Sequence, residues 1–370
     1  MIFITIIAFI VIFSFLILVH EWGHFIMARR AGIEVEEFGI GLPPRAKAFY
    51  KDKKGTVYSL NWIPFGGYVR LYGQDSADPK LLKSKKSFAS KTILQRSAVI
   101  VAGVAMNFIF AWLLISIGFM IGMKPFLVTS EDVQRAAEQG IVETQHVLYI
   151  HEVTSGSPAE AAHIQTGDLI TKINQDPAPL AEGLGGTINK GKENTVSVLR
   201  KGEELSFTVI PDKEGHVGFS ISDEKYIKEV NTVKYSPLVA PLKAAKEVGR
   251  LSILTVQMFG KVIVSIISKF AVPEGVAGPI GIAHMTYSFV QQGFMAVLQF
   301  TALISISLGV INIMPFPALD GGRLLFIIFE IVLRRNPNAK WEGIIHTIGF
   351  ALLMALILIV TWNDILTLIK

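Results

Sequence analysis

Four stretches of this 370-residue chain lack Asp, Glu, Lys and Arg over a length that can cross a lipid bilayer. A transmembrane helix needs about 20 apolar residues, and the stretches span residues 1–20, 97–123, 294–313 and 344–361. Hydrophobic residues make up 51% of the chain and charged residues only 18%, below the roughly 25% of soluble chains. This balance excludes a simple water-soluble protein and predicts a polytopic α-helical membrane protein with four transmembrane helices.

The first stretch has an alternative interpretation as a cleaved signal peptide. It lacks the basic segment that begins a signal peptide, and its apolar run continues past Glu21 to Ala28, which is too long. Cleavage would also remove the strongest sequence motif of the chain. We therefore interpret this stretch as a permanent span.

Lys and Arg residues indicate the orientation, because cytoplasmic loops are enriched in them. Residues 29–96 contain 14 basic and six acidic residues, and the loop between the last two spans carries four more basic residues. We predict that both loops are cytoplasmic, and that both termini and the region between spans two and three lie outside. A basic loop of this kind sets topology more often than it binds nucleic acid, so we expect no nucleic-acid partner.

A metal-binding motif lies within the first span. His20-Glu21-Trp22-Gly23-His24 is an HExxH sequence, and residues four apart share one face of a helix. Both imidazoles can then reach one zinc ion, while Glu21 acts as a general base on a water molecule. Because ionisable groups inside a membrane are costly and usually functional, we favour a metal site over a chance pattern.

The chain contains no cysteine, so the third protein ligand of a catalytic zinc must be a carboxylate or another His. A disulfide scaffold and a cysteine nucleophile are excluded for the same reason. The candidate is Asp320, in the segment Asn312–Gly322 after the third span. The predicted orientation puts both the HExxH motif and Asp320 at the cytoplasmic side. Alternatively, Asp320 caps the helix that begins near Arg323, and the residues alone leave both interpretations open.

The HExxH motif and the NxxPxPxLDGG sequence after the third span together resemble the site-2 protease family of intramembrane zinc metalloproteases. The closest likeness is to the bacterial regulator-of-sigma-E protease group. The resemblance implies that His20, His24 and Asp320 bind one Zn²⁺ and that Glu21 is the catalytic base. It also implies that Asn312 helps to hold the substrate near the metal.

Residues 31–90 resemble the loop of this family that contains a re-entrant β-hairpin. The expected hairpin glycines, which we include among the substrate-binding candidates, are Gly39, Gly41, Gly66 and Gly67. Such a hairpin offers a strand edge to an extended substrate. In the second span, Gly103 and Asn107 match the GxxxN pattern of the family, although for Gly103 we favour small-residue helix packing.

Residues 124–235 are polar, with 11 basic and 17 acidic residues, which is consistent with the outer side of the membrane. Alternating apolar residues predict β-strands there, and Ser157 with Glu160 predicts a helix that begins with a capping box. The segment resembles a circularly permuted bacterial PDZ domain. Its peptide-binding loop would contain Gly215 and Gly218. Such a domain either binds a peptide as an added strand or only obstructs access to the membrane core, and both remain open.

Residues 236–290 differ from the four spans because Lys and Arg residues interrupt a helical apolar pattern. We predict an amphipathic helix on the outer membrane surface. A fifth span is the alternative, disfavoured by Lys261 in its middle. Residues 1–123 and 291–370 then form the two halves of the membrane core.

The resemblance implies regulated intramembrane proteolysis by a multi-pass zinc metalloendopeptidase of the bacterial cytoplasmic (inner) membrane. Expected substrates are single-span proteins such as anti-sigma factors, or remnant signal peptides, cleaved in or near the transmembrane segment. The residues argue against two other classes of protein. A metal transporter does not need Glu21 between the two His residues, and an inactive PDZ-bearing scaffold does not need the intact motifs.

Overall fold

The computed structural model describes residues 2–74, 84–269, 273, 276–334 and 339–369. Parts of the predicted loop 31–90 and of the predicted segment 236–290 therefore lie outside the described residues. The chain divides into two compact units, which we call the helical unit (Met1–Met123 with Lys234–Lys370) and the β unit (Lys124–Val233).

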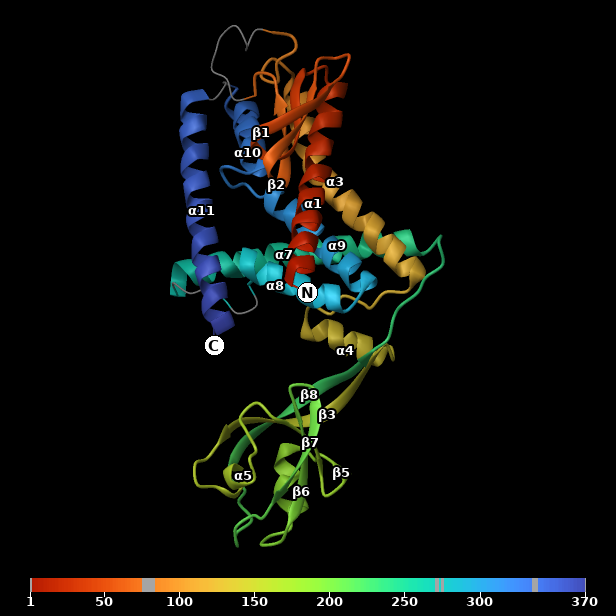
Figure 1. Ribbon diagram of the computed structural model, residues 1–370, viewed down its shortest axis with the longest axis vertical. Coiled ribbons are helices and arrows are strands. Elements are labelled where there is room, and N and C mark those ends of the chain that lie inside the picture. Colours follow the sequence, from red (N-terminus) through yellow and green to blue (C-terminus); the bar gives the residue numbers. More distant parts are fainter. Residues whose placement is uncertain (1, 75–83, 270–272, 274–275, 335–338, 370) are drawn as a thin grey trace. The chain divides into compact units, whose positions relative to one another are not determined.

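Long helices make up most of the helical unit (Figure 1). In the described part of the chain they are α1 (Ile2–Arg30), α3 (Ile93–Ile121), α7 (Ala240–Lys269), α8 (Pro279–Gln291), α9 (Phe294–Ile313), α10 (Asp320–Leu333) and α11 (Ala339–Ile369). Length and composition make α1, α3, α7, α9 and α11 candidate membrane spans. These are five candidates among the described residues, one more than the four transmembrane helices predicted from the sequence. The additional candidate is α7, which the sequence predicts to lie on the outer membrane surface. Figure 1 shows α7 running across the direction of α1 and α11, and the number of spans stays a prediction.

Close packing of α1 against α3 fixes the region around the HExxH motif. A Cβ atom at Gly23 would lie 2.2 Å from the carbonyl oxygen of Ala102, and one at Gly103 would lie 2.3 Å from the imidazole of His24. Real Cβ atoms do not approach other atoms so closely, so both positions need glycine. Gly103 thus has the helix-packing role that we favoured for it.

A long β-hairpin follows α1. Its strands β1 (Val35–Lys51) and β2 (Val57–Leu71) pair in the antiparallel direction. Residues 37–40 pair both with the end of β2 and with its beginning, so the bent strands form a small sheet. The predicted hairpin is therefore present as a β structure, and whether it re-enters the membrane stays a prediction.

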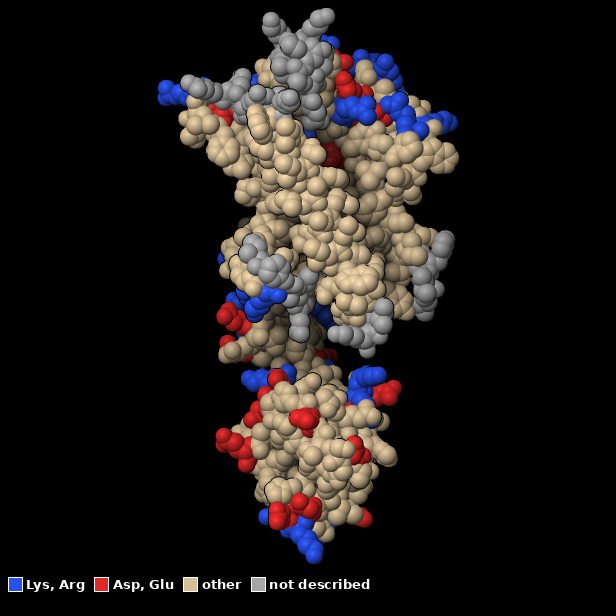
Figure 2. All heavy atoms as spheres, turned by 90° about the vertical axis from the view of Figure 1, so that its left-hand side faces the viewer, with Lys and Arg blue, Asp and Glu red and all other residues tan. Residues whose placement is uncertain are grey.

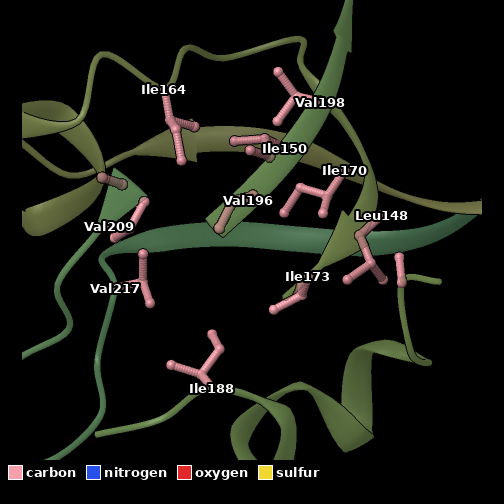
Figure 3. Close-up of a cluster of buried hydrophobic side chains, with 12 residues drawn as sticks. Leu148, Ile150, Ile164, Ile170, Ile173, Ile188, Val196, Val198, Val209 and Val217 are labelled. Atoms are coloured by element: carbon pink, nitrogen blue, oxygen red, sulfur yellow. The ribbon is translucent and has the colours of Figure 1, made fainter. Parts of the chain in front are cut away.

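The β unit contains one antiparallel sheet and several short helices. Its described elements are α4 (Ser130–Glu138), β3 (Val142–Val153), α5 (Pro158–Ala161), β4 (Leu169–Ile173), β5 (Asp176–Pro177), η1 (Ala181–Gly183), α6 (Leu184–Thr187), β6 (Asn194–Arg200), β7 (Glu203–Val209) and β8 (Phe219–Val230). The strand order is β7-β6-β4-β3-β8, and β5 pairs with β4. Figure 3 shows its core, where Ile150, Ile170, Ile173 and Val198 are fully buried.

The predicted capping box at α5 is only half present. Ser157 is the N-cap, and its hydroxyl accepts a hydrogen bond from the Glu160 N–H at 3.3 Å. The Glu160 carboxylate accepts from the N–H of Gly156 at 2.6 Å instead of from Ser157. The prediction of a closed box was wrong because the Ser157 N–H donates to the carbonyl oxygen of Thr154 at 3.2 Å.

A buried carboxylate holds the hairpin together. Glu37 is 2% exposed and accepts hydrogen bonds from Arg45 Nε at 2.8 Å, Arg45 Nη2 at 2.6 Å and Ser59 Oγ at 2.6 Å. Burial raises the pKa of Glu37, but these hydrogen bonds outweigh it and hold the pKa below its ordinary value. The ionised form of Glu37 therefore stabilises the hairpin.

Replacing Glu37 with Gln should loosen the hairpin at neutral pH. We expect amide hydrogen exchange in β1 and β2 to be roughly tenfold faster than in the wild type, because a hydrogen bond to a charged group is lost. Since the folded pKa is lowered, the wild-type advantage is complete above the ordinary pKa of 4.5 and is lost as the pH falls through the folded value. Equal exchange of both proteins at pH 7 would show that Glu37 has no such role.

Candidate metal centre

Three candidate ligands from two helices meet in the helical unit. His20 and His24 lie one turn apart on α1, each 8% exposed, and Asp320 is the first residue of α10. Asp320 Oδ2 lies 3.0 Å from His20 Nε2 and 3.1 Å from His24 Nε2, and the two Nε2 atoms are 3.1 Å apart. Residues that are 300 positions apart in the chain thus present three donor atoms to one point.

The donor atoms fit a zinc ion. With zinc–ligand bonds of about 2.0–2.1 Å in a tetrahedron, ligand atoms lie roughly 3.3 Å from one another. The three distances are close to this value, and Asp320 Oδ2 is buried with no hydrogen bond of normal geometry. The alternative in which Asp320 caps a helix is wrong, because the N-cap residue of α10 is Leu319 and no side chain caps that helix.

The remaining predicted site residues of the membrane helices line one cavity. It has a volume of about 210 Å³ and is lined by Ile17, His20, Glu21, Asn107, Leu308, Asn312, Ala318, Leu319 and Asp320. Glu21 Oε2 accepts a hydrogen bond from the backbone N–H of Val69 in β2 at 3.0 Å. A candidate base, a candidate substrate ligand and two of the three candidate metal ligands therefore share one small polar space.

Known proteins resemble this chain over nearly its whole length. The sequence pattern of Peptidase family M50 matches residues 8–356. The chain belongs to this family. Zinc metalloprotease RasP of Shouchella clausii is 29% identical over 98% of both chains, regulator of sigma E protease of Haemophilus influenzae is 30% identical over 98% of both, and regulator of sigma-W protease RasP of Bacillus subtilis is 28% identical over 98% of both. The protein is a metalloprotease of the site-2 protease type, as the resemblance implied, and the names of its relatives support zinc as the metal.

Two further groups of this M50 protein orient the imidazoles, and the sequence did not assign them this role. His24 Nδ1 lies 2.9 Å from the carbonyl oxygen of Val99, to which it donates when Nε2 binds a metal. Asn107 Nδ2 lies 3.3 Å from His20 Nδ1, and Asn107 Oδ1 is buried without a partner. The oxygen and nitrogen of the Asn107 amide are alike in shape, so the amide can equally be turned by 180°. In that orientation Oδ1 accepts a hydrogen bond from the Nδ1–H of His20, and the lone pair on His20 Nε2 is free to bind the metal. The family pattern GxxxN was the available signal.

The predicted hairpin glycines have packing reasons of their own. A Cβ at Gly39 would lie 2.4 Å from the ring of Tyr68, and one at Gly67 would lie 2.6 Å from Leu18 on α1. Gly41 and Gly66 have positive φ values of 81° and 74°, and none of the four is among the lining residues of the cavity. The structure therefore places Gly66 and Gly67 against α1 and Gly39 and Gly41 within the hairpin, and none of the four lines the cavity at the metal centre.

Gly215 and Gly218 belong to the β unit, in the turn before β8. Both have positive φ, and a Cβ at Gly218 would lie 2.2 Å from that of Ser157. Nearby, Asp212 accepts hydrogen bonds from the backbone N–H groups of His216 and Glu214, which lower its pKa. Asp212, Glu214 and His216 are exposed, and these bonds describe an ordinary turn, so we assign no metal to them.

Replacing Asn107 with Ala should weaken zinc binding roughly 10- to 100-fold, because partners of ligating imidazoles contribute that much to affinity. The measurement is a competition between the purified full chain and a zinc chelator. Asn231→Ala, which changes an exposed residue of the β unit, is the control and should bind zinc as the wild type does. Wild-type affinity in the Asn107 variant would contradict a role in orienting His20.

Proposed function

We propose that this M50 protein hydrolyses peptide bonds in or near the transmembrane segments of single-span membrane proteins. His20, His24 and Asp320 hold one Zn²⁺, and Glu21 is the catalytic base. The observation that carries the proposal is the cavity between apolar helices that His20, Glu21 and Asp320 line together, with His24 Nε2 only 3.1 Å from Asp320 Oδ2. Polar groups inside a membrane must be enclosed by protein, and a peptidase needs such a space to bring water to a buried peptide bond.

The chemistry follows from the positions of the side chains. When bound, zinc acidifies a water molecule and polarises the scissile carbonyl. The Glu21 carboxylate takes a proton from the attacking water and passes it to the amine that leaves when the C–N bond breaks. The hydrogen bond from the Val69 N–H orients Glu21 Oε2, so the hairpin positions the base as well as the substrate.

A helical substrate must be extended before it reaches the base, since its backbone groups are paired within the helix. The end of β2 supplies a strand edge close to Glu21, because Val69 both pairs with Phe38 and donates to Glu21. We infer that the substrate adds to the hairpin near this edge. Asn312, which lines the same cavity as Glu21, then donates to a carbonyl of the extended segment.

The charge distribution supports a location in the bacterial cytoplasmic membrane with the zinc site toward the cytoplasm. Figure 2 shows Lys and Arg gathered at the end of the helical unit that carries the hairpin, while the adjoining body is mostly uncharged. Both termini and the β unit then lie outside the cytoplasm. In this arrangement α7, which runs across the direction of α1 and α11, lies on the outer membrane surface.

We further propose that the β unit is a circularly permuted PDZ domain. Its strand β8 lies at the edge of the described sheet and follows the turn that contains Gly215 and Gly218. An edge strand beside such a turn is the place where a PDZ domain adds a peptide. If no peptide binds there, the domain limits access to the helical unit by its size.

Wild type and Glu21→Gln, purified as full chains, test the proposal with a single-span anti-sigma factor or a remnant signal peptide. Both proteins should contain zinc, but the wild type should cleave the substrate much faster than Glu21→Gln. We expect Glu21→Gln to be slower by a factor of about 10² or more, since general base catalysis contributes that much. Mass spectrometry of the products locates the cleaved bond, which should lie in or near the transmembrane segment.

Glu182→Gln, a change at an exposed position of the β unit, is the matched control and should cleave as the wild type does. Equal cleavage by wild type and Glu21→Gln, or the absence of zinc from both, would refute a zinc peptidase. Zinc flux into liposomes without any cleavage would favour a transporter instead.

A further inference from the structure

The short loop that delivers Asp320 to the metal centre contains a strained residue. Ala318 has a φ of 79°, a left-handed conformation that is unfavourable for residues with a Cβ atom. Its neighbour Leu319 and Asp320 itself line the same cavity. A strained backbone persists only where the surroundings hold it, so some contact must stabilise Ala318.

Helix α11 supplies that contact. The backbone N–H of Ala318 donates a hydrogen bond to Nδ1 of His346 at 3.0 Å. One turn further along α11, a Cβ at Gly349 would lie 2.3 Å from Pro317, so the helix backbone approaches the loop closely. The ring of His346 also packs against Phe326 of α10, with ring centroids 5.4 Å apart. His346 thus contacts both the loop before Asp320 and the helix that begins with Asp320.

We propose that His346 is a positioning residue that holds Asp320 at the distance a zinc ion requires. This inference rests on the zinc site proposed above. His346 is not among the residues that line the cavity, and it acts through the backbone of Ala318. Without an acceptor for that N–H, the loop relaxes toward a common conformation and moves the Asp320 carboxylate away from the two imidazoles.

The role depends on where the acceptor atom lies. A neutral imidazole with its hydrogen on Nε2 offers a lone pair at Nδ1. The side-chain oxygen of Asn reaches nearly the same position as Nδ1, whereas that of Gln reaches nearer to Nε2. Leu has a similar volume and no acceptor. These three replacements therefore separate the hydrogen bond from the packing.

Two measurements on the purified full chain test the proposal. The first is the zinc affinity, measured by competition with a chelator, and the second is the absorption spectrum of the Co²⁺-substituted protein. His346→Leu should bind zinc roughly 10- to 100-fold more weakly and should shift the cobalt spectrum. His346→Asn should stay close to the wild type in both measurements. Adding Ala318→Gly to His346→Leu should recover part of the affinity, because glycine adopts positive φ without steric cost.

His284→Leu, a change at an exposed position of α8, is the control and should match the wild type. Wild-type affinity and spectrum in His346→Leu would overturn the proposal, as would equal weakening by His346→Asn and His346→Leu. If His346→Leu does not fold, His346→Asn and His346→Gln decide, and equal affinities of these two would overturn it. Zinc that binds equally well to wild type and His24→Ala would refute the underlying zinc site instead.

Discussion

The convergence of His20, His24 and Asp320 on one point is the interaction on which the rest of the helical unit depends. A carboxylate and two imidazoles in an apolar environment are costly unless a cation joins them. The three donor atoms lie 3.0–3.1 Å apart, which suits a zinc ion. A cation shared by the three ligands would also explain why α1 and α10 meet although the chain between them includes a whole further unit.

The surroundings of the centre are arranged to keep these side chains in place. Glycines at positions 23 and 103 let α1 and α3 approach closely, with Gly103 directly against the imidazole of His24. Glycines 321 and 322 do the same beside Asp320, since a Cβ there would lie 2.1 Å and 2.4 Å from carbonyl oxygens of the preceding segment. Hydrogen bonds from three other elements add to this packing. Val99 and Asn107 of α3 contact the two imidazoles, Val69 of β2 donates to Glu21, and His346 of α11 accepts from the loop before Asp320.

The sequence predicted those features that depend on local spacing. The HExxH motif needs only one helical turn, and the absence of cysteine directed the search for a third ligand to Asp320, which the structure places beside both imidazoles. Family membership, protease activity and a membrane protein of several apolar helices were confirmed.

The contacts of Val69 and His346 could not be predicted in this way, because they depend on how β2 and α11 pack against α1 and the loop before Asp320. For Asn107 the GxxxN pattern marked the residue but not its contact with His20. Nor does hydropathy decide the number of spans, since α7 is long and apolar enough to qualify. Its Lys and Arg residues and its direction across α1 are what distinguish it.

Zinc content and X-ray absorption of the purified full chain test the central claim most directly. The account predicts one zinc per chain, bound by two imidazole nitrogens and by oxygen. It also predicts that replacing His20, His24 or Asp320 with Ala removes most of this zinc. One zinc per chain in all three variants, with an unchanged absorption spectrum, would contradict the account.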